Sequence, residues 1–410
     1  MEDTSENTRL SNQICLGLVA HVDSGKTTLA ESILFQSGRI RTMGRVDHKD
    51  AFLDTYELEK SRGITIFSKQ AQTNIGEKQV TLLDTPGHAD FSAEMERTLQ
   101  VLDYAVLVIS GADGVQGHTE TLWSLLKRYQ VPTFLFINKM DQPGTDREAL
   151  MAELKKRLND SCVDFAALDG PEDAVPEEIW ETIAMSDEEF LEQYLENGSI
   201  AQEDIRRLIR QRKLFPCYFG SALKLQGVEE LLVGLERWMD DGMSGDACSK
   251  GDLNGELPHV NPDVAFGAKV FKISRDAQGA RLTWLKVTGG ALRVKAPLTY
   301  RAQNQDYNEK ADQLRLYSGV KFRALEEGGA GSVVAVTGLS HSYVGLGLGA
   351  EAEASAPLLQ PVLTYQLILP DGADAHSALI KLRELEEEDP MLRIVWDERY
   401  GQIHVQLMGK

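Results

Sequence analysis

The chain has 410 residues, more than one ordinary hydrophobic core serves, so we expect two or three domains. A formal net charge of −20 argues against adhesion to nucleic acid through net charge, although local basic patches could still meet an RNA partner. The polar N-terminus is unlike a signal peptide, and no apolar run approaches the ~20 residues of a membrane span. The scattered cysteines have no metal-binding spacing: Cys15, Cys162, Cys217 and Cys248. These features predict a cytoplasmic monomer with reduced thiols and without membrane or DNA partners.

Between about residues 12 and 240, short apolar segments alternate with amphipathic ones. Strands are predicted at ICLGLVA, QVTLLDT, YAVLVIS and PTFLFIN, and helices over 27–36 and 116–129. Continuous apolar strands separated by helices are typical of a parallel sheet that is covered on both faces. The interval between Asp141 and Ser221 is expected to contain helices and little strand. Residues 1–243 are therefore predicted to form an α/β domain.

The composition changes at 244–262, which we interpret as a linker because the segment is polar and rich in Gly, Asp and Ser. Residues 263–357 alternate apolar and polar positions between glycine turns, and this predicts an all-β unit, a small barrel. The order strand, helix, strand, strand over 358–410 predicts a truncated ferredoxin-like (split β-α-β) domain of the α+β class.

The stretch AHVDSGKTTL, residues 20–29, lies between a predicted strand and a predicted helix, as a phosphate-binding loop (P-loop) requires. Backbone N–H groups there can point at phosphate oxygens, helped by the helix N-terminus. The residues expected to bind are Asp23, Ser24, Gly25 for close approach, Lys26 for the β- and γ-phosphates, Thr27 for Mg²⁺ and Thr28 for the α-phosphate. Ala20 replaces the first glycine of the usual pattern, which costs little if its φ is negative. The alternative is a chance Gly-Lys-Thr at a helix start.

A second motif, LLDTPGHADF, ends the next predicted strand at Asp84, where a carboxylate can hold Mg²⁺ through water. Gly87 can donate its N–H to a γ-phosphate, and His88 is interpreted as the residue that orients the attacking water. A lone histidine would more often be solvated or in the core. Upstream, Thr65 in RGITIFS can add a second hydroxyl to Mg²⁺, and its alternative is an ordinary strand threonine. The loop 38–62 is expected to order around a triphosphate.

A third motif, FINKMD, indicates which base is bound. Asp141 can accept the two hydrogens on the guanine edge, while Asn138 holds the loop and the Lys139 stem covers the ring. Adenine reverses the pattern on that edge, so the carboxylate discriminates against it. The stretch GSAL is expected to close the pocket through Ser221, Ala222 and Leu223. These ordered motifs predict a GTP hydrolase that uses Mg²⁺.

The same motifs resemble the translation-factor GTPases, a family that includes elongation factor G. AHVDSGKTTL, RGITI, DTPGHADF and NKMD carry the resemblance, and the barrel and the β-α-β-β segment resemble the family's second and third domains. ESILFQSG and FINKMDQPG are most similar to the Tet(M)-type tetracycline-resistance ribosomal protection proteins. The resemblance implies a ribosome-dependent GTPase, with an elongation factor G paralogue or a release factor three relative as alternatives. A binding module without hydrolysis is the alternative from another class.

The resemblance also implies roles for further residues. Asp23 would help to bind a monovalent cation such as K⁺, Val22 and Ile64 would form an apolar gate near His88, and ribosomal RNA would position His88. No arginine is assignable as an internal finger, which suits slow intrinsic hydrolysis that ribosomes stimulate. The family's fourth and fifth domains are expected to be missing from this chain. Ribosome contact is expected at Lys269, Lys272, Arg281 and Lys286, unless these are scattered solvated charges.

Overall fold

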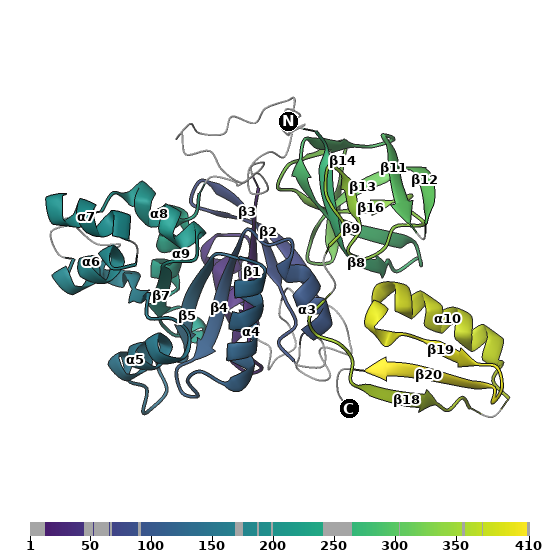
Figure 1. The fold of residues 1–410 in the computed structure, drawn as a ribbon, viewed down its shortest axis with the longest axis horizontal. Helices are drawn as coiled ribbons and strands as arrows, with labels where there is room; N and C mark the ends of the chain where they lie inside the picture. The colour runs from purple at the N-terminus through teal and green to yellow at the C-terminus, as the bar shows by residue number, and fades with distance from the viewer. Residues whose placement is uncertain are drawn as a thin grey trace. The chain divides into compact units, whose positions relative to one another are not determined.

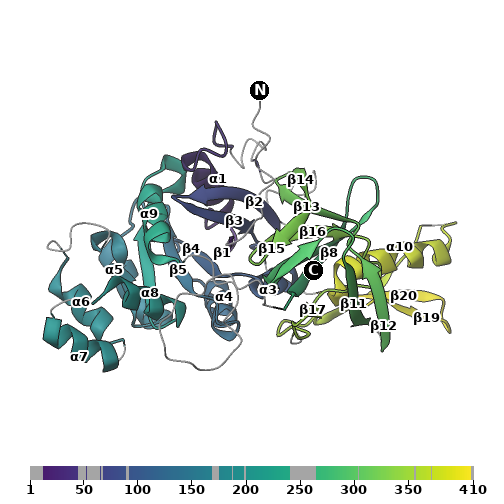
Figure 2. The ribbon, with the colours of Figure 1, turned by 90° about the horizontal axis from the view of Figure 1, so that it is seen from above.

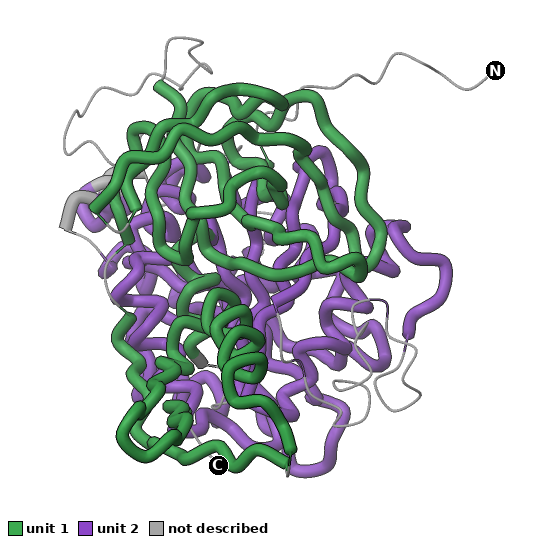
Figure 3. Tube along the Cα trace, turned by 90° about the vertical axis from the view of Figure 1, so that its right-hand side faces the viewer, with its two compact units in different colours: residues 1–13, 89–101, 243–410 green, residues 14–88, 102–242 purple. Residues whose placement is uncertain are grey.

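The computed structural model describes residues 13–44, 52, 65, 68–88, 92–168, 175–186, 188–197, 200–240, 265–302, 304–354, 357–370 and 372–407. The chain forms two compact units, drawn in different colours in Figure 3. We call residues 14–88 with 102–242 the sheet unit, and residues 1–13, 89–101 and 243–410 the barrel unit. The predicted linker 244–262 lies outside the described residues, so the predicted domain boundaries stay predictions.

The sheet unit is organised by a seven-stranded sheet with the order β2-β3-β1-β4-β5-β7-β6. The strands are β1 Ile14–Ala20, β2 Lys69–Ile75, β3 Lys78–Asp84, β4 Tyr104–Ser110, β5 Thr133–Asn138, β6 Cys162–Asp164 and β7 Phe215–Phe219. All neighbours pair in parallel except β2, which is antiparallel to β3 at the edge. The predicted parallel sheet is therefore confirmed, with one antiparallel edge strand added.

Two expectations about this sheet were incomplete or wrong. The segment KQAQTNI was not predicted as a strand because it has no continuous apolar run, which an edge strand does not need. A turn at Gly76 (φ +56°) connects it to β3, with which it pairs. The interval between Asp141 and Ser221 was expected to contain little strand, but it contains β6 and β7. Both are short, three and five residues, so neither is long enough to show a clear strand pattern in the sequence.

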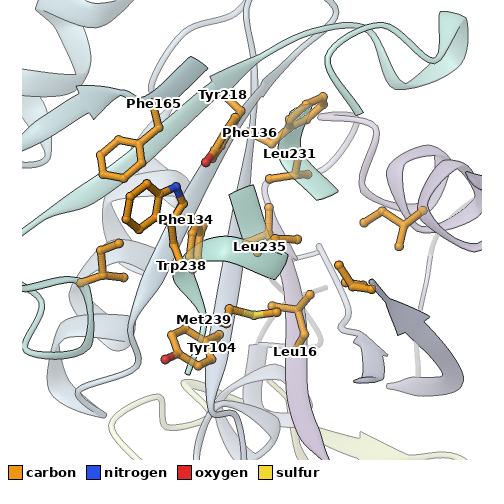
Figure 4. Close-up of a cluster of buried hydrophobic side chains, with 14 of the residues drawn as sticks. Leu16, Tyr104, Phe134, Phe136, Phe165, Tyr218, Leu231, Leu235, Trp238 and Met239 are labelled. Carbon is orange, nitrogen blue, oxygen red and sulfur yellow. The ribbon is translucent and has the colours of Figure 1, made fainter. Parts of the chain in front are cut away.

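Helices cover both faces of this sheet. They are α1 Lys26–Gln36, α4 Gly117–Arg128, α5 Arg147–Arg157, α6 Glu177–Ala184, α7 Glu188–Asn197, α8 Gln202–Arg210 and α9 Val228–Trp238. Figure 1 and Figure 2 show α4 on the opposite side of the strands from α1 and α9. On the α9 side, Leu16 packs with Phe134, Leu235 and Trp238 in one apolar cluster (Figure 4). Alternate β1 residues such as Cys15 and Val19 are buried as well, which explains the continuous apolar strand sequence.

The barrel unit contains the predicted all-β segment. Its strands are β8 Gly267–Arg275, β9 Arg281–Gly289, β10 Ala291–Arg293, β11 Pro297–Ala302, β12 Gln305–Lys310, β13 Gln313–Ser318, β14 Lys321–Leu325, β15 Glu327–Gly329, β16 Val333–Thr337 and β17 Gly347–Gly349. They form a six-stranded sheet, β14-β13-β16-β9-β8-β17, and the pairs β10-β15 and β11-β12. Alternate residues such as Ala268 and Val270 enter one apolar cluster, as the period of two predicts.

The same unit includes α3 Ser92–Leu99 and a C-terminal β-α-β-β segment. The latter consists of β18 Leu363–Leu367, α10 Ala375–Glu388, β19 Val395–Asp397 and β20 Gln402–Leu407. Its antiparallel sheet has the order β18-β20-β19, in agreement with the predicted element order. Within the described ranges, no helix of either unit combines the length and apolar character that crossing a bilayer demands.

The basic residues proposed for ribosome contact do not form an open cationic surface. Lys272 and Lys286 are 8% and 7% exposed, respectively, so neither presents its charge freely to solvent. Three of the four form ion pairs: Lys269–Glu351 at 3.3 Å, Lys272–Glu94 at 3.0 Å and Arg281–Glu387 at 3.2 Å. Acidic side chains of the same unit thus pair with Lys269, Lys272 and Arg281, and ribosome contact at these residues stays a prediction.

Candidate functional site

The predicted site residues converge at the carboxyl ends of the parallel strands in the sheet unit. Asp84, Ser110 and Asn138 end β3, β4 and β5, respectively. The register pairs Leu18 with Asp84 and Ser110 with Asn138, so these ends lie at one edge of the sheet. This edge is where open α/β sheets bind ligands, because loops that follow the strands meet there.

The predicted phosphate loop follows β1 at this edge. Ala20 ends β1, pairs with Val108 and is not among the described residues with positive φ, so an alanine fits where the usual pattern has glycine. Gly25 has a φ of +87°, and a Cβ atom there would overlap the Asn138 amide. The Asn138 side chain in turn donates from Nδ2 to the Ser24 carbonyl oxygen at 2.8 Å. This bond connects the base motif to the phosphate loop.

Asp23 has a φ of 61°, a left-handed conformation that is uncommon for residues other than glycine. Such residues concentrate at ligand sites, where the surrounding structure maintains them. Thr28, the last predicted phosphate ligand of this loop, is half-buried in the first turn of α1.

Lys26 and Asp84 form a buried ion pair at the start of α1; the exposed fraction is 6% for Lys26 and 0% for Asp84. The second carboxylate oxygen of Asp84 is also buried and has no hydrogen-bond partner among the described residues. The hydroxyl oxygens of Thr27 and Thr65 lie 3.4 Å apart, although 38 residues separate them in the sequence. Hydroxyl and carboxylate oxygens are the ligands that Mg²⁺ prefers, so the residues present fit this ion.

The second motif lies directly beside the phosphate loop. A Cβ atom on Gly87 would be 3.3 Å from the Ala20 carbonyl oxygen and 3.8 Å from Lys26 Cε, so this backbone contacts the loop closely. The next residue, His88, is half-buried, as is Val22 of the predicted gate. The other gate residue, Ile64, lies outside the described residues, as does most of the loop 38–62.

Two further histidines lie in the sheet unit: His21 belongs to the AHVDSGKTTL motif but was given no role there, and His118 belongs to none of the motifs. His21 follows β1 immediately, and His118 lies in the first turn of α4. Their Nδ1 atoms are 3.3 Å apart. Burial, and then the nearby charges of His21 and His88, lower the pKa of His118, so its ring is neutral at pH 7.

The base motif is held by hydrogen bonds between loops. Asn138 Oδ1 accepts the Ala222 backbone N–H at 2.9 Å, so that N–H is already engaged by the protein. The Gly220 carbonyl oxygen accepts the N–H of Met140 at 3.0 Å. Between these bonds, Lys139 takes a left-handed φ of 62°. Leu223 of the same closing loop is 51% exposed.

Asp141 is exposed as a whole residue, but its side chain is only 21% exposed. Its pKa lies below the ordinary value because the Ser221 hydroxyl, and then the Lys224 ammonium, donate to the carboxylate. Lys224 Nζ lies 3.1 Å from Asp141 Oδ2. The sequence reasoning missed this lysine, although it immediately follows GSAL in the chain.

Together these groups can hold a polyphosphate and a base at one sheet edge. The phosphate loop offers backbone N–H groups, a helix N-terminus and a lysine, and Asp141 offers an ionised acceptor. The structure thus brings together the predicted residues that it describes, while their individual roles stay predictions. Among the described residues, no group of three or more His, Cys, Asp and Glu side chains could hold a metal ion.

Comparison with known proteins gives a consistent result. Residues 11–241 match the family described as elongation factor Tu GTP binding domain. Elongation factor G 2 of Syntrophomonas wolfei is 31% identical, with 100% of this chain and 65% of the relative covered. The tetracycline resistance protein TetP of Clostridium perfringens is 30% identical, with 97% and 61% covered. Elongation factor G of Mycoplasma pneumoniae is 31% identical, with 96% and 64% covered. The chain thus spans less than two thirds of each of these relatives.

A solved structure from Thermus thermophilus has the same fold. Its TM-score is 0.81 at 24% sequence identity, with 97% of this chain and 64% of that chain covered. The similarity extends beyond the sheet unit, because the matched share includes nearly all of the present chain.

Proposed function

The chain belongs to the elongation factor Tu GTP-binding domain family, and from this membership we propose that it hydrolyses GTP to GDP and phosphate. The observation that carries the proposal is the convergence of the buried Lys26–Asp84 pair with the Thr27 and Thr65 hydroxyls. Phosphoryl transfer needs mainly positioning and charge neutralisation, which such a group provides. The proposed sites lie wholly within the sheet unit.

The phosphate loop and Lys26 bind the phosphates, with Ser24, Gly25 and Thr28 as further ligands. Lys26 provides positive charge toward the transferred phosphoryl group, and Gly87 donates its N–H to the same group. Thr27, Thr65 and Asp84 would hold Mg²⁺, which neutralises phosphate charge when bound. Asp23 would help to bind a monovalent cation such as K⁺.

His88 orients the attacking water in this proposal. His88 is half-buried and follows Gly87 in the chain. Because the Gly87 backbone contacts the phosphate loop, His88 would lie close to the proposed γ-phosphate site. Val22 and Ile64 would restrict access to the histidine as an apolar gate. A single-turnover assay with ribosomes tests the role, with His88→Ala compared with wild type.

The base specificity follows from Asp141. Its ionised carboxylate accepts both hydrogens of the guanine edge, whereas adenine presents the opposite pattern there. Asn138, Lys139 and the loop Ser221–Leu223 complete the pocket. A competition assay with labelled GTP tests this assignment: unlabelled GTP and GDP should displace the label, and ATP should not. Displacement by ATP at equal concentration would contradict it.

We further propose that hydrolysis depends on the ribosome. Relatives named elongation factor G and tetracycline resistance protein TetP match nearly the whole chain, and these names support a role in translation. In related systems an external activator raises the hydrolysis rate by about 10³–10⁵-fold. The measurement is GTP turnover with and without ribosomes. A ribosome-independent rate would contradict the proposal, and a rate near zero in both conditions would favour a binding module.

The finer role we propose is ribosomal protection against tetracycline, exerted by the whole protein. The candidate from the same class is a paralogue of elongation factor G, which is supported by the relatives of that name. Susceptibility of cells that carry the full-length protein, with and without tetracycline, separates the two. Protection should raise the drug concentration that cells tolerate, whereas a translocation factor should leave it unchanged.

A further inference from the structure

The carboxylate of Asp141 has two protein donors, and both come from one short turn. Lys224 Nζ lies 3.1 Å from Asp141 Oδ2. The Ser221 hydroxyl also donates to this carboxylate, and the two donors together lower its pKa. Asp141 follows β5 and Lys224 follows β7, so the contact joins two loops at the strand ends of the sheet unit.

The turn that carries Lys224 has a closed backbone. The Ser221 carbonyl oxygen accepts the N–H of Lys224 at 3.1 Å and that of Gln226 at 3.0 Å, and the Ser221 N–H donates to the Gln226 carbonyl oxygen at 2.9 Å. A Cβ atom on Gly220 would overlap the Gln226 carbonyl oxygen, so the start of the turn is also tightly packed. These contacts fix the backbone of Lys224, and its ammonium reaches Asp141 from a turn of defined shape.

The carboxylate has enough acceptor capacity for both donors and for a base. An ionised carboxylate has about four lone-pair sites. Ser221 and Lys224 use two of them, which leaves two for the pair of guanine hydrogens that Asp141 is proposed to accept. Guanine therefore does not have to displace the lysine, and both can contact Asp141 at once.

The ammonium of Lys224 also has hydrogens to spare. An ammonium group has three hydrogens, and its contact with Asp141 uses one. The Lys224 side chain is 54% exposed, so a ligand at the site can reach it. Lys224 thus offers a charged donor directly beside the carboxylate that is proposed to read the base.

Guanine has an acceptor next to the hydrogens that Asp141 would bind. On its ring, the oxygen at C6 adjoins N1–H, and N1–H adjoins the amino group at C2. A donor within hydrogen-bond distance of the carboxylate oxygen that accepts N1–H therefore lies in range of the C6 oxygen. Another donor of the closing loop, the N–H of Ala222, already donates to Asn138 Oδ1 at 2.9 Å.

An ordinary surface ion pair is the competing explanation. Exposed ion pairs contribute little to stability and need no function. That explanation leaves the location of this pair unaccounted for, because Asp141 is the residue proposed to read the base. Lys224 comes from the loop proposed to close the same pocket, immediately after Leu223.

We propose that Lys224 is a specificity-determining residue for guanine, whose ammonium contacts Asp141 Oδ2 and donates a hydrogen bond to the C6 oxygen of the base. Oδ2 then accepts N1–H, and Oδ1 accepts from the amino group at C2. Adenine has an amino group at C6, which sets a donor against the ammonium, so the lysine adds to the discrimination that Asp141 provides. The inference rests on the proposed function, because it assigns a base contact within the proposed GTP site.

Two guanine analogues separate the contacts with the base. In 6-thio-GDP a sulfur atom, which is a weaker acceptor, replaces the C6 oxygen, and inosine diphosphate lacks the amino group at C2. We expect wild type to prefer GDP over 6-thio-GDP, and Lys224→Met to reduce this preference by at least about fivefold, since a charged hydrogen bond to oxygen is lost. The preference for GDP over inosine diphosphate should stay within about twofold of wild type, because Asp141 keeps its contact with the C2 amino group.

Isothermal titration calorimetry on the full chain, at one salt concentration, gives the dissociation constants. The comparison of two preferences cancels any effect of the larger sulfur atom that wild type and variant share. Lys156→Met, at an exposed lysine of α5 in the sheet unit, is the matched control and should leave both preferences unchanged.

Three outcomes would overturn the inference while leaving the proposed function intact. The first is an unchanged preference for GDP over 6-thio-GDP in Lys224→Met. The second is loss of the preference over inosine diphosphate alone, since Lys224 would then act only through Asp141. The third is an equal loss of both preferences, which would show a lysine that maintains the pocket as a whole. By contrast, wild type that binds ATP as well as GTP would fail the proposed function itself.

Discussion

The two units of the molecule differ in where their unpaired buried polar atoms lie. In the barrel unit, Arg315 pairs with Asp276 at 2.8 Å, and the same aspartate also accepts the N–H groups of Gln278 and Ala280. Among the described residues, buried atoms without a hydrogen-bond partner include one oxygen of Asp84, the hydroxyl of Ser110 and Nε2 of His118 in the sheet unit, and Nε of Arg97 in the barrel unit. Asp84 and Ser110 end parallel strands, and His118 lies in the first turn of α4, the helix that follows Ser110.

The position of the unpaired atoms in the sheet unit indicates where a ligand binds. A buried polar group without a partner costs about 1–3 kcal/mol, so proteins seldom retain one without a reason. Asp276 of the barrel unit has its hydrogen-bond partners within that unit, so its role is to stabilise the local structure. The strand ends of the sheet unit retain polar capacity, which is the arrangement expected where a ligand binds.

We expect the greatest change from His88→Ala. Ribosome-stimulated hydrolysis should fall by about 10²–10⁴-fold, the usual contribution of a side chain that orients or transfers a proton. GTP affinity should hardly change, because the histidine is proposed to contact the water and not the nucleotide. Single-turnover kinetics and nucleotide titration measure the two quantities. A large loss of affinity would show that the histidine is structural, and His376→Ala in the barrel unit is the control.

The next effect is expected from breaking one ion pair in each unit. Lys26→Ala leaves the Asp84 carboxylate buried without its cation, which should lower the free energy of unfolding by about 3–5 kcal/mol. It should also weaken GTP binding by about 1.5–3 kcal/mol, because a charged bond to phosphate is lost. Urea unfolding and nucleotide titration provide the measurements.

Arg315→Ala is the corresponding variant in the barrel unit, since it breaks the Arg315–Asp276 ion pair there. It should destabilise the protein but leave nucleotide affinity unchanged. Addition of Asp84→Asn to Lys26→Ala should recover stability by removing the uncompensated charge, without recovering GTP binding. If both single variants weakened GTP binding equally, the distinction between the units would be lost.

A moderate effect is expected from Asp141→Asn. Replacement of one carboxylate oxygen by an NH₂ group puts a donor opposite the guanine donors, so GTP affinity should fall by at least about tenfold. Because hydrogen bonds from Ser221 and Lys224 lower the pKa of Asp141, the wild-type carboxylate stays ionised from neutral pH down to its lowered pKa. Loss of this contribution should begin only as pH falls through that value. Unaltered GTP selectivity of the variant would contradict the role.

The weakest effect concerns acid stability of the sheet unit. The pKa of His118 is below its ordinary value of 6.5, so between the two values the unfolded chain binds more protons than the folded chain. Stability should therefore fall as pH decreases through 6.5, and this loss is complete once pH is below the folded pKa. His118→Gln should remove that part of the dependence. Hydrogen exchange of β1 and β4 at about pH 7.5 and 5.5 measures it, and an identical dependence in the variant would contradict the assignment.

Local sequence was enough to identify the phosphate-loop and base motifs, since each is a short segment that follows an apolar strand. Parallel strands necessarily bring their carboxyl ends to one edge, so Asp84 and Asn138 could be assigned to one site from the sequence alone. The order of the three architectures followed in the same way from local periodicity.

Which distant side chains meet became known only from the folded chain. The fold places β2 antiparallel at the sheet edge, joins Lys224 to Asp141, and brings His118 to His21 across 97 residues. It also neutralises Lys269, Lys272 and Arg281 with acidic neighbours. A strand or a loop motif depends on nearby residues, whereas ion pairs and histidine contacts depend on packing between segments that no local pattern relates.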